Sequence, residues 1–279
     1  MAINNPAFRD PAFKQGGAGT TPAMTAQQLE ELYRQPAGAS LGPQVPTAVE
    51  PEGGAMTYED TVVKSVVSFA VLLVGAAVGW FTFGVAPWLW IAAGLVGFVL
   101  ALVNIFKKEP TPALILAYAG AQGIFLGGIS MMYETMLSGI VFQAVLATVA
   151  VVGVTLALFA SGKIRASKKA TKVFLIAMVG YLVFSLLNVV LMLFGAVSNP
   201  WGLRGLDIPG TNIPLGLIIG VFVIIMGAYS LVLDFDFVQQ GVRNKAPRKF
   251  AWTAAFGIMV TVIWLYLEIL RMIAIARSN

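Results

Sequence analysis

Long apolar stretches dominate the chain from about residue 60 onward, and short polar stretches separate them. A bilayer core ~30 Å thick takes roughly 20 apolar residues of α-helix to cross. Seven stretches reach this length, and we predict a membrane-spanning helix in each, at residues 65–83, 87–106, 112–132, 140–160, 173–197, 215–233 and 251–274. The pattern therefore predicts an all-α integral membrane protein, with a bundle of seven transmembrane helices over residues 57–279.

The first two predicted spans are separated only by Gly84-Val85-Ala86-Pro87. Glycine freedom and the fixed φ of proline favour a tight turn there. Trp80, Trp88 and Trp90 surround this turn, as expected for an aromatic belt at a membrane interface. One single long span remains the competing interpretation.

Composition agrees with the pattern, because the 279 residues are 58% hydrophobic and only 11% charged, with a mean hydropathy of +0.83. The chain has no cysteine and no histidine. This excludes disulfides, thiolate or imidazole metal sites, cysteine nucleophiles and Ser-His-Asp triads. We find no nucleophile with an identifiable base and predict that the protein is not an enzyme.

Basic residues gather in three of the predicted loops, at residues 107–108, 163–172 and 243–249, whereas the alternate loops contain only Arg204. By the positive-inside rule, the N-terminus and the basic loops are predicted to be cytoplasmic and the C-terminus to lie outside. The sequence pI near 9.5 then reflects membrane topology, and no nucleic-acid partner is expected.

Residues 1–56 differ from the rest, being rich in Pro, Gly, Ala, Gln and Thr. Such a segment buries too little apolar surface to offset its ordering entropy, so we predict a disordered cytoplasmic tail. Within it, Leu29, Leu32 and Tyr33 share one helical face and could dock on a partner or on lipid. No signal-peptide pattern is present. Thr57 and Asp60 have the spacing of a helix-capping box.

Three acidic residues, Asp234, Asp236 and Glu268, fall within or at the end of predicted spans. Carboxylates inside a bilayer are costly and tend to mark ion paths or switches. Asp234 and Asp236 cannot share a proton as an aspartyl-protease pair, because positions i and i+2 do not face each other on a helix. In a simpler interpretation, both aspartates lie at the end of their helix beside Arg243, Arg248 and Lys249, and Glu268 pairs with Arg271 near the outer surface.

Small residues at i, i+4 spacing occur in three spans, as Gly75 with Gly79, Gly123 with Gly127, and Gly216 with Gly220. We interpret these pairs first as sites of close helix packing.

Three short motifs resemble one family. Residues 231–234 (LVLD) resemble the I-L-Y-D motif of the Bax inhibitor-1 family, residues 265–268 (LYLE) its L-Y-L-D motif, and residues 142–148 (FQAVLAT) its Q-A-L-x-x-T region. The resemblance covers the seven spans, leaves the N-terminal tail unmatched, and points to the bacterial YccA-like members. It implies a multi-pass protein of the bacterial plasma membrane.

The resemblance also implies that the bundle passes calcium down its gradient, gated by two acids that correspond to Asp234 and Glu268. Two carboxylates in a low-dielectric site share a proton and respond to acidity, and their oxygens suit Ca²⁺. The two acids are thus candidates for ion and pH sensing, with Asp236 beside them, and for a Ca²⁺ site; no other cofactor is expected.

Three departures from the family pattern stand out. Glu268 replaces an aspartate, and the second span lacks the interior arginine that locks the acidic pair in some bacterial members. At ~1.5 Å per residue, Asp234 lies ~30 Å below the outer end of its helix but Glu268 only ~12 Å, so straight helices would not bring the two level.

Two functional classes therefore stay open. One is a pH-sensitive calcium or cation leak. The other is a non-transporting regulator that binds a membrane-bound protease or another membrane partner. The YccA-like resemblance implies this role, and a long tail would suit it. The oligomeric state is left open.

Overall fold

The structure is a computed structural model, which describes residues 54–197 and 199–278. Seven α-helices account for most of these residues, and all seven are long and apolar enough to cross a membrane. They are α3 Tyr58–Thr82, α4 Leu89–Phe106, α5 Pro112–Met136, α6 Ile140–Ala160, α7 Lys168–Leu193, α8 Leu215–Arg243 and α9 Ala251–Ser278, with short 3-10 turns η2 Gly202–Gly205 and η3 Arg248–Phe250. The predicted seven-helix membrane fold is confirmed.

The helix boundaries extend several predicted spans. α3 begins at Tyr58, because the Thr57 hydroxyl accepts a hydrogen bond from the Asp60 amide (3.1 Å) and donates one to its carboxylate (3.0 Å), as the capping spacing predicted. Residues 83–88 form a turn between α3 and α4, closed by a hydrogen bond from the Ala86 amide to the Thr82 carbonyl (2.8 Å). The single-span interpretation is therefore wrong.

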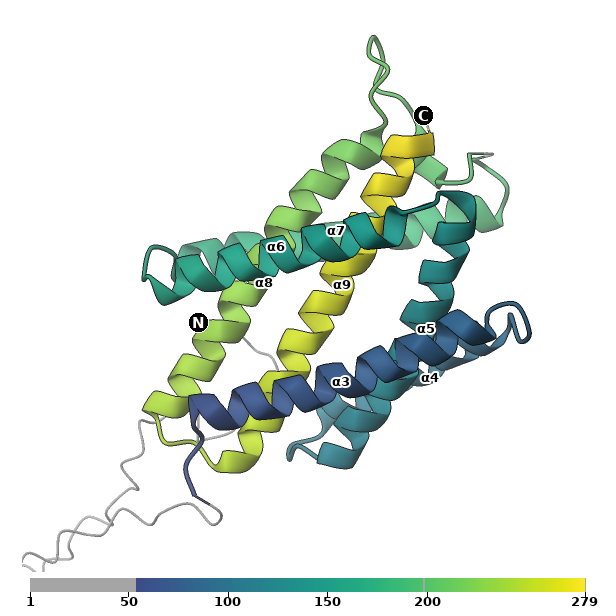
Figure 1. The fold of residues 1–279 in the computed structure, drawn as a ribbon. Helices are drawn as coiled ribbons and strands as arrows, with labels where there is room; N and C mark the ends of the chain where they lie inside the picture. Colours follow the sequence, from purple (N-terminus) through teal and green to yellow (C-terminus); the bar gives the residue numbers. More distant parts are fainter. Residues whose placement is uncertain (1–53, 198, 279) are drawn as a thin grey trace, which may run out of the picture.

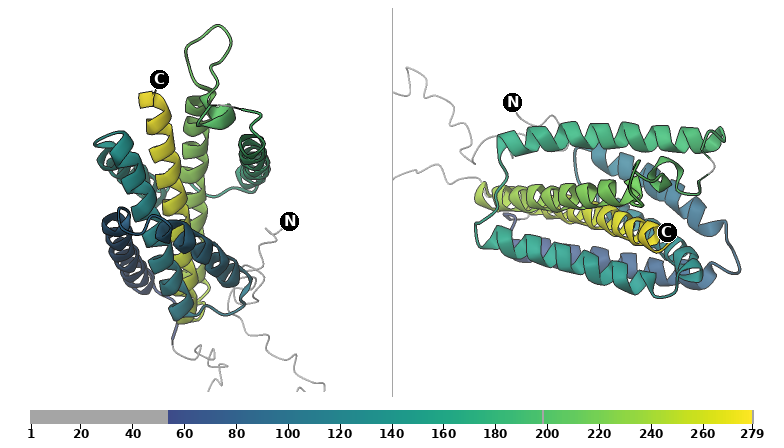
Figure 2. Two further views of the ribbon diagram at one scale, coloured as in Figure 1. Left: turned by 90° about the vertical axis from the view of Figure 1, so that its right-hand side faces the viewer. Right: turned by 90° about the horizontal axis from the view of Figure 1, so that it is seen from above.

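Helix α9 lies at the centre of the bundle, in contact with α3, α5, α6 and α8. Figure 1 shows α8 and α9 running together, crossed by the α3–α4 pair on one level and by α6 and α7 on another. Seen from above in Figure 2, α6 and α7 lie on opposite sides of the α8–α9 pair. Because α9 is surrounded, polar groups on it are enclosed by protein.

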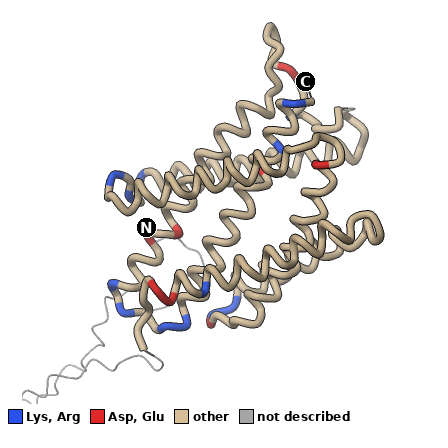
Figure 3. The backbone as a smooth tube through the Cα atoms, viewed as in Figure 1, with Lys and Arg blue, Asp and Glu red and all other residues tan. Residues whose placement is uncertain are grey.

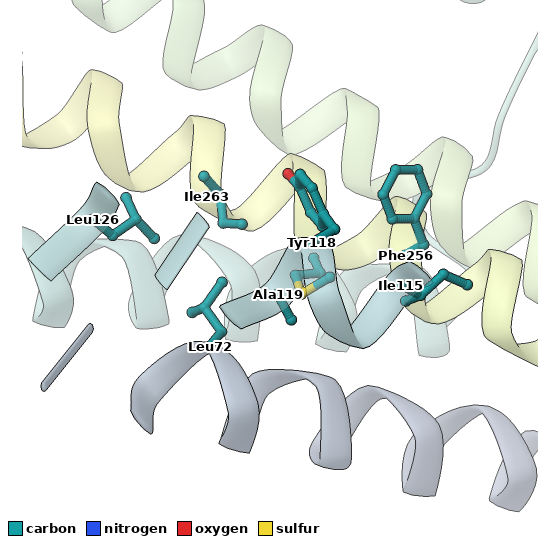
Figure 4. Close-up of a cluster of buried hydrophobic side chains, with 8 residues drawn as sticks. Leu72, Ile115, Tyr118, Ala119, Leu126, Phe256 and Ile263 are labelled. Carbon is teal, nitrogen blue, oxygen red and sulfur yellow. The ribbon is translucent and has the colours of Figure 1, made fainter. Parts of the chain in front are cut away.

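Close packing of α3 against α5 depends on glycines. A Cβ atom at Gly75 would lie 2.5 Å from the Gly120 carbonyl oxygen, and one at Gly123 would lie 2.2 Å from the Leu72 carbonyl oxygen. Beside this contact, Leu72, Tyr118 and other buried side chains from α3, α5 and α9 form an apolar core (Figure 4). The packing interpretation of these glycines is confirmed.

The same explanation holds for α8. A Cβ atom at Gly216 would lie 2.6 Å from Ile275, and one at Gly220 would lie 2.7 Å from Met272, both on α9. Glycine at these two positions lets α8 and α9 approach closely enough to enclose polar groups between them.

The loops rich in lysine and arginine lie at one end of the bundle, as Figure 3 shows. We call it the basic end and define it by residues 107–111, 161–167 and 244–250. Two ion pairs link its elements: Arg248 with Asp60 at 2.6 Å, and Lys249 with Glu109 at 2.8 Å. The pair of Lys249 with Glu109 joins two of the predicted basic loops, and Figure 3 shows the third at the same end.

Residues 54–56 pack onto the basic end. The Met56 amide donates to the Ala246 carbonyl (2.7 Å), and the Met56 side chain is buried against Phe250 and Val238. Residues 54–56, which the sequence assigned to the disordered tail, are therefore held against the bundle. The predicted disorder of residues 1–53, and the helical face at Leu29, Leu32 and Tyr33, lie outside the described residues.

Candidate functional site

Helix α8 continues well past the acidic residues. It ends at Arg243, so Asp234 and Asp236 lie inside the helix and not at its end. The expected ion pairs with Arg248 and Lys249 are absent from the described residues, since these cations pair with Asp60 and Glu109. The interpretation that the helix ends at the two aspartates is thus wrong.

Asp234 faces α9. The Thr261 hydroxyl donates to its Oδ2 at 2.6 Å, and a Cβ atom at Gly257 would lie only 3.1 Å from its Oδ1. The Ser230 hydroxyl lies 3.3 Å from that of Thr261. Within the described residues, Asp234 forms no ion pair, and its one hydrogen bond comes from the Thr261 hydroxyl.

Asp236 lies on another face of α8 and does not join this contact. Its Oδ2 accepts a hydrogen bond of 2.6 Å from the Gln240 side chain, one turn further along the same helix. A carboxylate held within its own helix does not bridge two elements. Asp236 is therefore a suitable comparison for Asp234 and a weaker candidate for ion sensing.

Glu268 is enclosed by cations. Only 4% of the residue is exposed. Its Oε2 lies 3.2 Å from Arg204 Nη1, its Oε1 lies 2.6 Å from Arg271 Nη1, and the Tyr181 hydroxyl also donates to Oε1. The expected pairing with Arg271 is present, but it lies in the interior and includes a second arginine. A buried carboxylate with this many donors is fully compensated.

Arg204 reaches the interior from η2, the turn between α7 and α8. It is 5% exposed, donates to the Tyr181 hydroxyl (2.7 Å) and to Ser185 (3.3 Å), and stacks its guanidinium against the Tyr181 and Phe184 rings. The neighbouring Leu203 amide donates to the Asn188 side chain at 2.7 Å. These contacts fix η2 against α7 and aim Arg204 at α9.

The attachment of helix α7 to the bundle depends on such polar contacts more than on apolar packing. Its only buried residues are Thr171 and Asn188, near its two ends. Thr171 and Tyr229 of α8 are joined by their hydroxyls at 2.9 Å, Asn188 binds η2, and Tyr181 binds Glu268. The cluster of Tyr181, Arg204 and Glu268 thus joins α7, η2 and α9.

The structure does not bring Asp234 and Glu268 together. Asp234 contacts α9 at Thr261, and Glu268 lies seven residues further along α9, ~10 Å at ~1.5 Å per residue. The two acids occupy two levels, as the different depths in the sequence indicated. No cluster of three or more acidic side chains within residues 54–197 and 199–278 could hold a metal ion.

The sequence did not reveal Arg204 and Tyr181 as members of these sites, and it did not pair Thr261, a polar residue within a predicted span, with Asp234. A signal existed for Arg204, because it is the one basic residue in the alternate loops. We used it only to orient the chain. Tyr181 and Thr261 lie in apolar spans and carry no local sign of their partners.

The fold and these contacts define a class: a polytopic α-helical membrane protein with ionisable groups buried between its helices. A sequence profile described as "Bax inhibitor 1 like" matches residues 5–278, almost the entire chain. The chain therefore belongs to the Bax inhibitor 1 like family. The match includes most of the N-terminal tail, so the expectation that the tail would be unmatched is wrong. None of the curated proteins compared with the chain matched it.

Proposed function

We propose that the protein is a pH-sensitive leak for calcium or a similar cation, in which Asp234 senses the proton. The observation that carries the proposal is the contrast between the two acids. Glu268 is neutralised by two arginines, whereas Asp234 has a single hydrogen bond among the described residues, from the Thr261 hydroxyl between α8 and α9. An intramembrane acid without a cation must be protonated, hydrated or bound to a cation.

Protonation of Asp234 changes its contact with α9. The ionised carboxylate only accepts hydrogen bonds, whereas the protonated acid can also donate one. Thr261 presently donates to Asp234 and lies close to Ser230. A change at this point alters which groups hold α8 against α9, and so couples acidity to helix contact.

Glu268 has a different role in this proposal. Glu268 forms ion pairs with Arg204 and Arg271. In this proposal they keep the bundle closed at the level of Glu268, which lies further from the basic end than Asp234. Calcium is the cargo here and not a resident cofactor, and carboxylate oxygens are suitable hard ligands along its route. The bacterial plasma membrane, with the basic end facing the cytoplasm, is the proposed location.

The experiment is calcium flux into proteoliposomes that contain the full-length protein, scanned from pH 6 to 8. Asp234→Asn and Glu268→Gln are compared with the wild type, and Asp236→Asn is the matched control. We expect a pH-dependent leak. Asp234→Asn should flatten its pH dependence, Asp236→Asn should preserve it, and Glu268→Gln, which weakens the restraint, should raise the leak at every pH. A wild-type protein that passes no calcium at any pH would remove the channel proposal.

A second candidate is a regulator that binds a membrane protease or another membrane partner and transports nothing. The packing of Met56 against Phe250 favours it, because the end of the tail contacts the loop between α8 and α9. A partner held by the tail could therefore act on this helix pair. Deletion of residues 1–50 should abolish partner binding if this candidate holds, and should leave the flux unchanged if the leak is the function.

A further inference from the structure

A cavity of about 720 Å³ lies between α3 and α6, with α8 and α9 behind it. Its walls are almost entirely apolar, and they include Phe69 and Leu73 of α3 and Leu156 and Phe159 of α6. The volume falls within the range of small-molecule sites, ~300–1,000 Å³. All of these residues belong to membrane-spanning helices, so the cavity is at the depth of the lipid hydrocarbon.

The cavity is long and begins at the basic end. On α3 it extends from Tyr58 to Leu73, ~22 Å at ~1.5 Å per residue. An elongated apolar cavity of this kind matches an acyl chain better than a compact ligand.

A cation lies at the mouth of the cavity. Arg165, exposed in the loop between α6 and α7, donates to Gln239 at 2.6 Å and holds its guanidinium 4.9 Å from the Phe159 ring centre. Gln239 and Phe159 both line the cavity. The guanidinium keeps further N–H donors for an anion, since it has five in all.

Inside the mouth, one polar group lacks a partner. The Ser65 hydroxyl oxygen is buried and has no hydrogen-bond partner among residues 54–197 and 199–278, the only such side-chain atom there. Ser65 lines the cavity. It lies two turns into α3 from Tyr58, ~10 Å by helix rise. A buried hydroxyl without a partner carries a free-energy penalty. A ligand acceptor would remove it once the Ser65 side chain turns toward the cavity that the residue lines.

From these observations we propose that the cavity binds one anionic phospholipid of the leaflet at the basic end. Its phosphate contacts Arg165, an ester carbonyl accepts from Ser65, and an acyl chain lies along Phe69 and Leu73. Basic residues beside gaps between transmembrane helices suit anionic headgroups. This site is separate from Asp234 and Glu268 and does not depend on the leak proposal.

The test uses full-length protein in detergent, with phosphatidylglycerol as the probe and native mass spectrometry to count bound lipids. We expect one retained phosphatidylglycerol, with phosphatidylcholine bound more weakly and excess inorganic phosphate unable to displace the lipid. Arg165→Gln should weaken binding roughly tenfold, as for loss of a hydrogen bond to a charged group. Lys163→Gln, in the same loop, is the matched control and should not change it.

Two variants of Ser65 separate binding from folding. Ser65→Ala removes only the hydroxyl, so the lipid-free protein should keep its thermal stability while lipid binding falls roughly fivefold. Ser65→Phe fills the cavity and should abolish retention, whereas Gly153→Phe, at a position with open space around it, should not.

Three results would overturn the proposal. The first is no retained phospholipid in the wild type, and the second is equal binding by the wild type and Arg165→Gln. The third is binding that arises only after deletion of residues 1–50, which would make the tail the occupant.

Discussion

Replacing Arg204 with methionine tests whether the buried ion pair holds the bundle together. The change removes the partner of Glu268 at 3.2 Å and the hydrogen bonds to Tyr181 and Ser185. Removing one partner of a buried pair costs about 3–5 kcal/mol, because the other charge is left uncompensated. Glu268 keeps Arg271 at 2.6 Å. We therefore expect the lower end of this range, about 3 kcal/mol of unfolding free energy.

The double variant Arg204→Met with Glu268→Met has a different expected outcome. Replacing both buried charges by apolar side chains is often neutral or stabilising, because the desolvation penalty disappears with the pair. Arg271, about one-third exposed, can then extend its charged head toward water. The double variant should recover most of the stability that Arg204→Met loses.

Unfolding free energies measured in lipid bicelles would decide between these outcomes. Arg277→Met is the matched control, because Arg277 donates to the Ser138 carbonyl at an exposed site, and it should change stability by less than about 0.5 kcal/mol. The stability losses of Arg204→Met and Glu268→Met alone are also measured. If the double variant loses as much unfolding free energy as their sum, Arg204 and Glu268 are not coupled and the reasoning fails. If Arg204→Met is as stable as the wild type, the ion pair does not hold η2 against α9.

Two further predictions concern packing and charge. Gly123→Leu should destabilise the protein by about 3 kcal/mol, since a Cβ would meet the Leu72 carbonyl oxygen, whereas Gly153→Leu, with open space around it, should not; equal thermal stability of the two would contradict this. The hydrogen bond from Lys249 holds the pKa of Glu109 below its ordinary value. That contribution is present above the unfolded pKa of ~4.3 and is lost only as pH falls through the lower folded pKa. Lys249→Met should therefore leave flux between pH 6 and 8 unchanged; an altered flux profile would place a sensor at the basic end.

The number and order of the helices could be predicted from the sequence because each is a local property. A span needs about 20 apolar residues in succession, and α4 and α6 match their predicted ranges closely. Close packing at Gly75 and Gly123 was also predictable, because glycine leaves no side chain to keep two backbones apart, but the contact of α3 with α5 appears only in the structure.

The end of α8 was predicted ten residues too early for a physical reason. Hydropathy falls at Asp234, but a helix does not end where its side chains become polar. The backbone of α8 stays helical as far as Arg243. The Asp234 side chain accepts a hydrogen bond from Thr261 of the neighbouring helix α9. A polar residue in an apolar segment thus indicated a contact between helices and not the end of one.

The partners of Glu268 could not be found from local patterns. Arg271 is three residues away and was expected, but Arg204 and Tyr181 come from distant parts of the chain and meet Glu268 only in the folded bundle. Which of two arginines becomes buried depends on how η2 is held by Asn188, and this is a tertiary property.

The separation of the two acids has a consequence for any mechanism that couples them. A shared proton requires carboxyl groups in direct contact, whereas Asp234 contacts α9 at Thr261, two turns from Glu268 on the same helix. Coupling must then pass through α9 itself, which packs against α8 at Thr261 and is bound to η2 at Glu268. A displacement of α9 that begins at Asp234 would strain the ion pair between Glu268 and Arg204. In the proposed mechanism, the acid without a cation partner, Asp234, would be the sensor, and the acid with two, Glu268, would be the restraint.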